Sequence, residues 1–421
     1  MTKKIVLLGS GETAPTMVKV HRSIFAELGS PHNAVMLDTP FGFQANAEEI
    51  AAKAADYFRI SINEKIDVAS LKNYDTASAF EIERFKDQIS SSKYIFAGPG
   101  SPTYALRHWK SIDLANLLEK KLSGDFAIVF SSAAVLTLGR YTIPVYEIYK
   151  VGEEPQLRDG LNFLEAIGLD VLVIPHYNNQ EGGSHDTRYC YMGEDRLPIL
   201  ESQMEPSTAI LGIDEHTGVV IDLENDQVTI VGIGTVTIRR SGRSSSYMSG
   251  EAFTLGKFRS LLAGEKTGEV DDRFAQTQVI QEVADGEDLS VTPLRKALID
   301  FETEFEAAFS TRDASKALDT ILKIEDELEQ WRADTLQSDD FTYGRSLLRT
   351  SIARLGRWLE EGSFDKSSMI GPFVDTLLDL RTTFREERRF SDADLVRDRL
   401  IGAGVEVKDH PTGTSWTLIS E

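Results

Sequence analysis

The stretch AIVFSSAAVLTLG, residues 127–139, joins an apolar run to two serines and a series of small residues. This pattern is typical of a strand that runs through a turn into a helix, and open α/β folds place their functional groups at such turns. Ser132 stands just after the expected strand 126–131. Two interpretations are open at this point: a nucleophilic serine on an exposed turn, or a serine that caps the following helix.

The segments on both sides of this stretch indicate the fold class. Helices are expected at 45–59, 80–91 and 113–122, between apolar runs of strand length. The expected strands are 3–9, 34–38, 93–98, 126–131, 169–175, 208–214, 218–223 and 227–232. The first five are nearly continuously apolar, as strands covered on both faces are. We therefore predict a three-layer α/β domain over residues 1–240, with a largely parallel, flavodoxin-like sheet and the last three strands as an antiparallel addition at one end.

The remaining chain changes character. Residues 241–290 are polar and begin with the serine- and glycine-rich RRSGRSSSYMSG, so we expect a connector there. Residues 291–421 follow helical periodicity to about residue 403 and close with a short extended tail. The sequence thus predicts an α/β domain, a connector and an all-α C-terminal domain.

Composition excludes several classes of protein. The chain has 421 residues, with 45 basic and 67 acidic side chains and a net charge of −22. That charge argues against sequence-independent binding of nucleic acid, which depends on neutralising phosphates. The single cysteine, Cys190, rules out an internal disulfide framework, and no apolar run approaches the length of a membrane span. We expect a cytoplasmic protein with no membrane partner.

A nucleophilic serine needs a base and an acid that orients the base. His176 ends the expected strand 169–175, so it emerges at the same sheet edge as Ser132, and Glu147 lies in the loop between them. The backbone N–H of Ala133 follows the serine directly and is placed to face a developing oxyanion. Each of these residues also has a purely structural interpretation, and only their joint spacing favours the catalytic one.

In this order and spacing the chain resembles the aspartyl dipeptidase (peptidase E) and cyanophycinase group, which are serine peptidases with a class I glutamine-amidotransferase-like fold. The resemblance covers residues 1–240 and includes the glycine-rich turn FAGPGSPTYAL and the segment LGIDEHTGVVID. It implies that Ser132 is the nucleophile, His176 the general base and Glu147 the orienting acid. It further implies Ala133 and Gly100 as oxyanion donors, Ser101 as a substrate contact, and allows a homodimer.

The nucleophile turn departs from the family pattern G-T-S-A-G-A. Phe130 and Ala134 replace its two glycines, and Ser131 offers a second hydroxyl. Glycines relieve crowding at such a turn, so Phe130 puts the activity of the triad in doubt.

The loop HYNNQEGGSHDTRYCYMG, residues 176–193, also carries polar side chains. Asn178, Asn179, Asp186 and Arg188 are expected either to contact substrate or to hold the loop in shape through hydrogen bonds to its backbone. The histidines, acids and cysteine of this loop lack a compact metal-ligand spacing, so we expect no metal.

The segment GSGETA, residues 9–14, fits a dinucleotide-binding turn, with Asp38 at the end of the next strand. This short motif is a weak signal by itself, and we expect no cofactor.

Residues 384–419 resemble the C-terminal end of cysteinyl-tRNA synthetase, with matches that include Arg389, Asp394, Asp409 and Trp416. In those enzymes this end contributes to reading the tRNA anticodon. The catalytic H-I-G-H and K-M-S-K-S signatures are absent from the sequence, which excludes aminoacylation. From residue 290 onward the chain has 18 basic and 26 acidic side chains, a net charge of −8. We therefore favour a helical packing or partner-binding module over tRNA binding.

Two functional hypotheses remain. The favoured one is a serine hydrolase, a peptidase or amidase, that acts on a small peptide-like substrate. The alternative is a catalytically inactive α/β platform joined to a module that binds tRNA, a peptide or a protein.

Overall fold

The structure is a computed structural model, and it describes residues 1–29, 33–179, 185–265, 292–332, 338–361, 366–410 and 413–419. The chain forms two compact units. Unit 1 consists of residues 1–296 with 326–341, and unit 2 of residues 297–325 with 342–421.

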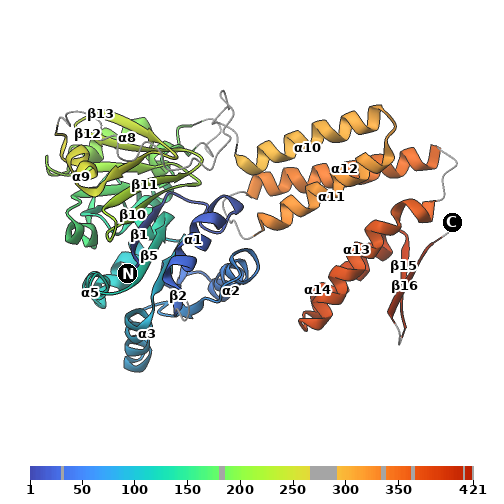
Figure 1. The fold of residues 1–421 in the computed structure, drawn as a ribbon, viewed down its shortest axis with the longest axis horizontal. Helices are drawn as coiled ribbons and strands as arrows, with labels where there is room; N and C mark the ends of the chain where they lie inside the picture. Colours follow the sequence, from blue (N-terminus) through green and yellow to red (C-terminus); the bar gives the residue numbers. More distant parts are fainter. Residues whose placement is uncertain are drawn as a thin grey trace. The chain divides into compact units, whose positions relative to one another are not determined.

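Unit 1 is built on an eight-stranded sheet (Figure 1). Its strands in spatial order are β14 (Ala252–Thr254), β11 (Gln227–Gly232), β10 (Thr217–Asp222), β1 (Lys3–Leu8), β5 (Phe126–Ser131), β4 (Tyr94–Ala97), β2 (Ala34–Leu37) and β3 (Asp67–Ala69). The five neighbouring strands β1, β5, β4, β2 and β3 are mutually parallel. On the other side of β1, the pairs β1–β10, β10–β11 and β11–β14 are antiparallel. The predicted α/β fold with a mainly parallel sheet is confirmed.

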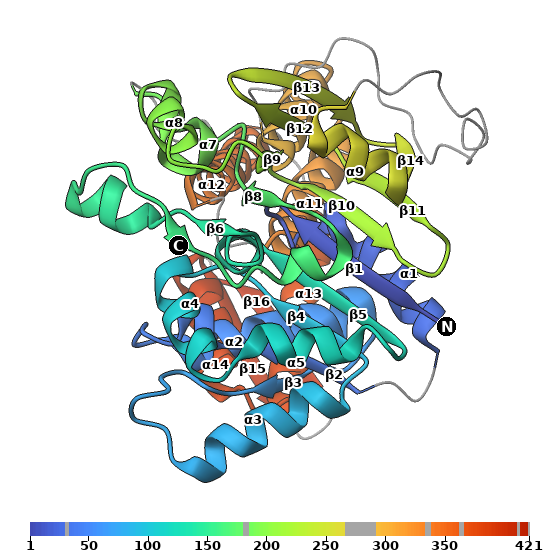
Figure 2. The same ribbon diagram turned by 90° about the vertical axis from the view of Figure 1, so that its left-hand side faces the viewer.

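Helices cover both faces of this sheet, because its strands alternate apolar side chains between two cores. Ile5 and Leu7 pack in the core beneath α3 (Ala79–Ser91), α4 (Pro102–Ser111) and α5 (Leu114–Lys121), while Val6 and Leu8 pack beneath α1 (Val18–Leu28) and α2 (Ala47–Tyr57). Figure 2 shows α3 and α5 running across the strands. The other helical segments of unit 1 are η1 (Pro15–Met17), η2 (Thr39–Phe41), η3 (Phe58–Ile62), α6 (Ser132–Leu136), η4 (Glu147–Val151), η5 (Phe163–Ile167), α7 (Arg188–Tyr191), α8 (Gly193–Glu201) and α9 (Leu255–Ala263).

A second sheet of four strands has the order β13 (Arg243–Met248), β12 (Thr235–Arg240), β9 (Ala209–Ile213) and β8 (Val171–Ile174). β6 (Tyr141–Thr142) and β7 (Arg158–Asp159) form a separate two-stranded ladder, and β6 contacts β8 of the second sheet. The expectation that strand 208–214 joins β10 and β11 in an antiparallel addition was wrong, because β9 belongs to the second sheet, where it pairs in parallel with β8 and in antiparallel fashion with β12. Both strands are buried along their whole length, so apolar patterning gives no signal of the partner.

The connector expected from residue 241 also differs from the structure. Residues 243–248 form β13, an edge strand paired with β12, and β14 and α9 follow. Most side chains of β13 are exposed, so this strand carries no apolar alternation by which its sequence would reveal it. The later part of the expected connector, residues 266–290, lies outside the described residues.

Unit 2 belongs to the helical C-terminal region, which confirms that prediction. Its helices come from α10 (Pro293–Ser310), α11 (Ala314–Gln330), α12 (Ser338–Glu361), α13 (Lys366–Glu386) and α14 (Phe390–Gly402). The expected extended tail forms a hairpin of β15 (Val405–His410) and β16 (Gly413–Leu418). Val374 and Leu378 of α13 pack with Leu400 of α14 and with Val405 and Val407 of the hairpin.

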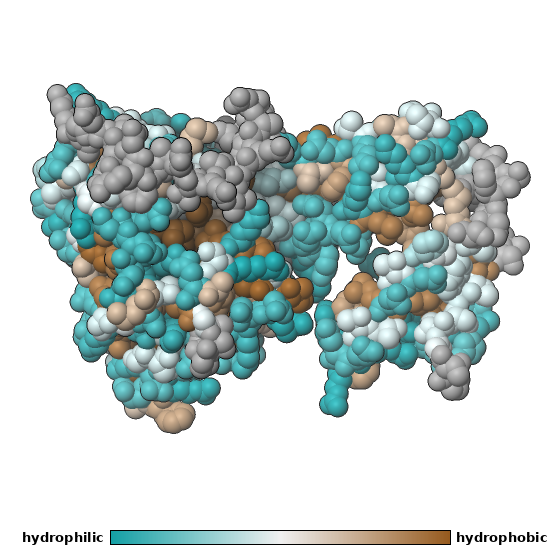
Figure 3. Space-filling view, viewed as in Figure 1, coloured by the Kyte–Doolittle hydropathy of each residue, from teal (hydrophilic) through white to brown (hydrophobic). Residues whose placement is uncertain are grey.

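Hydrophilic side chains cover much of the face seen in Figure 3. Among the helices of the described residues, none has both the length and the apolar character that a membrane crossing requires.

Candidate active site

Ser132 and His176 are in hydrogen-bond contact, with 2.9 Å between Ser132 Oγ and His176 Nε2. Ser132 lies where β5 turns into α6, and its φ of 49° is in the left-handed region that few non-glycine residues adopt. Such a strained turn between a strand and a helix is how α/β hydrolases present a nucleophile. The two residues are thus brought together, but they do not share one sheet edge as the sequence analysis expected, because β5 belongs to the eight-stranded sheet and β8 to the four-stranded one.

Glu215 is the carboxylate beside His176, with 2.9 Å between its Oε1 and His176 Nδ1. The strand pairing explains this contact. Because β8 and β9 are parallel neighbours, with Ile174 opposite Gly212, the residues that follow them emerge side by side. His176 and Glu215 each stand two residues beyond the end of their strand.

Glu147, the acid expected for this position, lies elsewhere. It opens η4, and its Oε2 accepts a hydrogen bond of 3.1 Å from Thr103 Oγ1. The nearest cationic group is that of Arg158, 4.0 Å from Oε1. The structure therefore gives Glu215 the place at His176 that the sequence analysis gave Glu147. Glu215 lies in the segment LGIDEHTGVVID, which the sequence analysis singled out. It was not considered as the acid because the strand before it was not expected to pair with the strand before His176.

Asn178 and Asn179, which were expected either to contact substrate or to hold the loop, both bind Glu215. Asn178 Oδ1 accepts a hydrogen bond of 2.8 Å from the Glu215 N–H, and Asn179 Nδ2 donates one of 3.3 Å to Glu215 Oε1. The two amides position the carboxylate against His176. The expected substrate role for them stays a prediction, but their side chains already have partners.

The electrostatics of Glu215 favour its charged form. Burial alone would raise the pKa of this carboxyl, but its hydrogen bond to His176 and the nearby histidine charges outweigh burial and lower the pKa. A carboxylate that stays ionised can hold a proton on Nδ1 and leave Nε2 as the acceptor that faces Ser132.

Two backbone N–H groups flank the nucleophile turn. Gly100 lies in the loop after β4, the strand next to β5, and that loop reaches the turn because Ala134 N–H donates to the Gly98 carbonyl over 3.3 Å. Gly100 has a φ of 142°, and a Cβ there would lie 2.0 Å from the Pro40 carbonyl oxygen, so only glycine fits. Ala133 follows Ser132 at the start of α6, where the first N–H groups lack partners within the helix.

Phe130 and Ser131, the departures from the family turn, both point into the protein. Phe130 is fully buried, and its ring lies 5.6 Å from that of Trp109 in the core beneath α4. Ser131 is fully buried too, and its hydroxyl donates to Glu12 Oε2 over 2.7 Å. Of the two serines, Ser132 is the one in contact with the histidine.

The other expected contacts have structural partners. Ser101 caps α4, because its Oγ accepts the Tyr104 N–H over 3.2 Å. Asp186 and Arg188 form a two-point ion pair with distances of 2.9 and 2.8 Å, and Asp186 also accepts the Glu194 N–H. The Arg188 hydrogen bond lowers the pKa of Asp186 well below its ordinary value.

The glycine-rich turn of residues 9–14 packs against the Glu215 loop. A Cβ on Gly9 would lie 2.1 Å from the Asp214 carbonyl oxygen, and one on Gly11 would lie 2.2 Å from His216 Nδ1. Ser10 Oγ accepts the His216 N–H over 3.2 Å. These glycines therefore allow two loops of the site to approach closely. The Asp38 carboxylate accepts hydrogen bonds from Ser70 Oγ and the Leu71 N–H.

Among the described residues, no group of three histidine, cysteine, aspartate or glutamate side chains is arranged to hold a metal ion.

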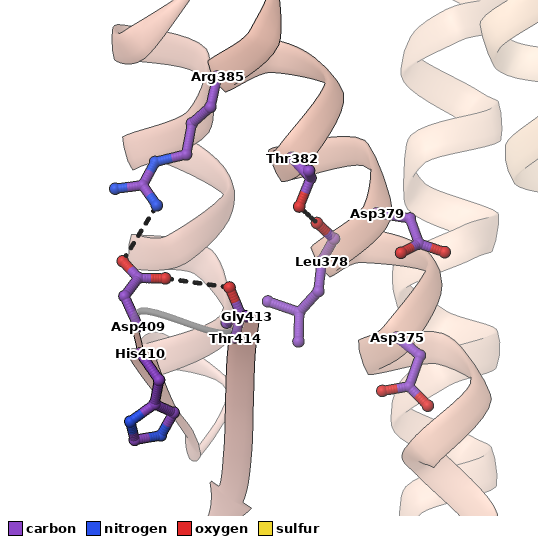
Figure 4. A pocket seen from close by; sticks show the side chains of 9 residues that line it. All are labelled: Asp375, Leu378, Asp379, Thr382, Arg385, Asp409, His410, Gly413 and Thr414. Carbon is purple, nitrogen blue, oxygen red and sulfur yellow. Dashed lines mark hydrogen bonds and ion pairs between the residues drawn. The ribbon is translucent and has the colours of Figure 1, made fainter.

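A hollow of about 400 Å³ lies in unit 2, between α13 and the hairpin (Figure 4). Asp409 is central to it: its carboxylate binds Thr414, Arg385 and the buried Arg381. The acids Asp375 and Asp379 line the opposite side. The serine–histidine–carboxylate contact that can activate a nucleophile lies instead in unit 1.

Comparison with solved structures finds similarity over part of the chain. A crystal structure of a peptidase from an acI-B1 Actinobacterium matches 60% of this chain and 97% of its own, with 18% identity and a TM-score of 0.47. A candidate peptidase E protein from Listeria monocytogenes EGD-e matches 59% of this chain and 99% of its own, with 14% identity and a TM-score of 0.36. The chain is thus similar in structure to peptidase E-like proteins over about 60% of its length.

Comparison with curated proteins finds cysteine–tRNA ligases. The ligase of Chlorobium luteolum is 32% identical over 125 residues, which are 28% of this chain and 24% of the ligase. That of Dehalococcoides mccartyi is 25% identical over 247 residues, 59% of this chain and 50% of the ligase. The chain therefore spans half or less of the length of these relatives. No family model matches the chain.

Proposed function

We propose that the protein is a serine hydrolase that cleaves an amide or ester bond of a small peptide-like substrate. Ser132 is the nucleophile, His176 the general base and Glu215 the acid that orients it. The observation that carries this proposal is the unbroken chain of contacts from Ser132 Oγ through the two ring nitrogens of His176 to Glu215, at 2.9 Å each.

The reaction follows from that geometry. With the ring proton on Nδ1 facing Glu215, Nε2 takes the proton of the Ser132 hydroxyl while Oγ bonds to the substrate carbonyl carbon. The carbonyl oxygen becomes an oxyanion, and the N–H groups of Ala133 and Gly100 are the proposed donors to it. His176 then returns the proton to the leaving amine or alcohol as the bond to carbon breaks. In the second half of the reaction, His176 takes a proton from water, which attacks the acyl-enzyme carbonyl. The proton then returns to Ser132 Oγ as the ester bond breaks and the acid product leaves.

The position of Phe130 supports activity over an inactive platform. Its ring is fully buried and packs with Trp109 in the core beneath α4, which accounts for the bulk of this side chain without placing it at the hydroxyl of Ser132. The strained φ of Ser132 supports the same conclusion, because a serine that only caps a helix does not need left-handed backbone.

The test is covalent labelling of the intact protein with a fluorophosphonate, mapped by mass spectrometry. We expect one adduct on Ser132 that is lost in Ser132→Ala and retained in Ser131→Ala. Turnover of any substrate found should fall about a thousandfold or more in Ser132→Ala, without loss of folding by circular dichroism. A folded wild-type protein that takes up no label would overturn the proposal.

A further inference from the structure

A small hollow of about 30 Å³ lies next to the nucleophile turn, on the α2 side of the large sheet. Its walls are mostly apolar, and one carboxylate, that of Glu12, reaches it from the loop after β1. The lining residues are Glu12, Thr13, Met36, Phe41, Ile50, Lys53, Ala54, Phe96, Gly98 and Pro99. Its volume is close to that of one water molecule, so it accepts only a small group.

Glu12 is tied to the catalytic turn by one of its two oxygens. Oε2 accepts the hydrogen bond from Ser131, the residue before the nucleophile. The Glu12 side chain is 5% exposed, and Oε1 has no hydrogen-bond partner among the described residues. The only side-chain atoms of the described chain that are both fully enclosed and unpartnered are Trp109 Nε1 and Arg381 Nε. Oε1 of Glu12 is therefore open to the hollow.

Gly98 leaves that oxygen accessible. A Cβ at this position would lie 3.4 Å from Glu12 Oε1 and 3.4 Å from the Phe96 ring, which is ordinary contact. An alanine would thus fit and would cover Oε1 with a methyl group.

Lys53, the cationic side chain among the residues that line the hollow, already has a carboxylate partner. Lys53 lines the hollow from α2, but its ammonium lies 2.9 Å from Glu49 Oε1, and both side chains are about half exposed. A carboxylate in apolar surroundings with an open oxygen attracts a positive charge more strongly than one in water. The net charge of −22 favours a cationic ligand at long range as well.

We propose that Glu12 recognises a primary ammonium group of the substrate, held by Oε1 in this hollow while Ser132 attacks the nearby carbonyl. The ammonium comes either from the α-amino group of the residue whose carbonyl is attacked or from a basic side chain. This inference rests on the proposed function, since it assigns substrate recognition to the same site.

The test uses four fluorophosphonates that label Ser132. Two carry a primary ammonium, on a one-carbon arm that imitates an α-amino group or on a five-carbon arm that imitates a lysine side chain. Each is matched by a probe in which methyl replaces the ammonium. The quantity measured is the ratio of labelling rate constants, ammonium over methyl, for each arm.

In the wild type we expect a ratio of about ten for one of the two arms, which identifies the source of the ammonium. In Glu12→Gln that ratio should fall to about one. Gly98→Ala, which keeps the carboxylate but covers Oε1, should lower it as well. Glu48→Gln removes the same charge from an exposed position on α2 outside the hollow and should leave the ratio as in the wild type.

The outcomes separate the two proposals. If no probe labels Ser132 in the wild type, the proposed function fails, and this inference fails with it. If the probes label Ser132 but the ratio is about one for both arms, or is equal in wild type and Glu12→Gln, the hollow takes a hydroxyl or a water. The hydrolase then stands and the role of Glu12 is refuted.

Discussion

At the scale of single residues, Phe130 is the bulkier of the two side chains that stand where the G-T-S-A-G-A pattern has glycines, the other being Ala134. The buried ring contributes to the core with Trp109, so we expect Phe130→Gly to lower the free energy of unfolding by about 4 kcal/mol. Phe130→Leu keeps most of the volume and should cost about 1 kcal/mol. Chemical denaturation of both variants measures this difference.

Labelling by the fluorophosphonate should stay close to the wild-type rate in Phe130→Leu, because the ring does not face the nucleophile. Much faster labelling in that variant, at unchanged stability, would mean that Phe130 restricts the site after all.

At the scale of elements, the pairing of β8 with β9 assembles the base and the acid of the site. The sequence predicted both strands and paired His176 with Ser132, but it expected the two at one sheet edge, whereas they follow strands of different sheets. It did not predict Glu215, because the partner of a fully buried strand is set by long-range packing that apolar patterning does not encode. Glu147 was favoured by its nearness in sequence and by its position in the family resemblance.

The hairpin β15–β16 is held to α13 by a charged pair that offers a second test. Arg381 is almost fully buried, and both its terminal nitrogens lie 2.8 Å from the Asp409 carboxylate. Asp409→Asn leaves a buried guanidinium without its charge partner, so we expect the hairpin to lose about 3 kcal/mol of local stability. Amide hydrogen exchange in the hairpin should then be about a hundredfold faster.

Arg385→Gln is the matched control. Arg385 lies 3.3 Å from the same carboxylate, but its side chain is about half exposed, so exchange should change less than tenfold. Equal effects of the two variants would contradict this account of the hairpin. Hydrogen bonding to Arg381 lowers the pKa of Asp409, so the stabilisation is present above the ordinary aspartate pKa and is lost as the pH falls below it.

At the scale of the whole molecule, the question is what the region similar to cysteine–tRNA ligase does. The net charge of −22, and the excess of acids in the C-terminal region itself, oppose binding to a polyanion. We expect no shift of tRNA by the full-length protein in a gel-shift assay at physiological salt, with a cysteine–tRNA ligase as the positive control. A shift that weakens steeply with added salt would instead establish tRNA as a partner.

The sequence predicted the central parallel strands and the helical region better than the edge strands and the second sheet. Buried parallel strands and amphipathic helices have strong periodic signals, and β1, β2, β4, β5 and the helical C-terminal region were found by them, whereas the short edge strand β3 was missed. The exposed edge strand β13 has no such signal. The second sheet was missed because the division of strands between sheets depends on contacts distant in sequence.

The candidate site was also predicted only in part. Ser132 and His176 were identified because strand ends are readable in a sequence. Glu12 was noticed only as part of a glycine-rich turn, and its place beside Ser131 depends on the pairing of β1 with β5.

The most direct measurement of the central claim compares Glu215→Gln with Glu147→Gln in the rate constant for fluorophosphonate labelling of Ser132. Both variants remove one carboxylate and keep the side-chain size. We predict that Glu215→Gln slows labelling by about a thousandfold or more, because His176 loses the group that holds its tautomer, while Glu147→Gln stays within a few fold of wild type. A large loss in Glu147→Gln, with Glu215→Gln close to wild type, would contradict the triad described here.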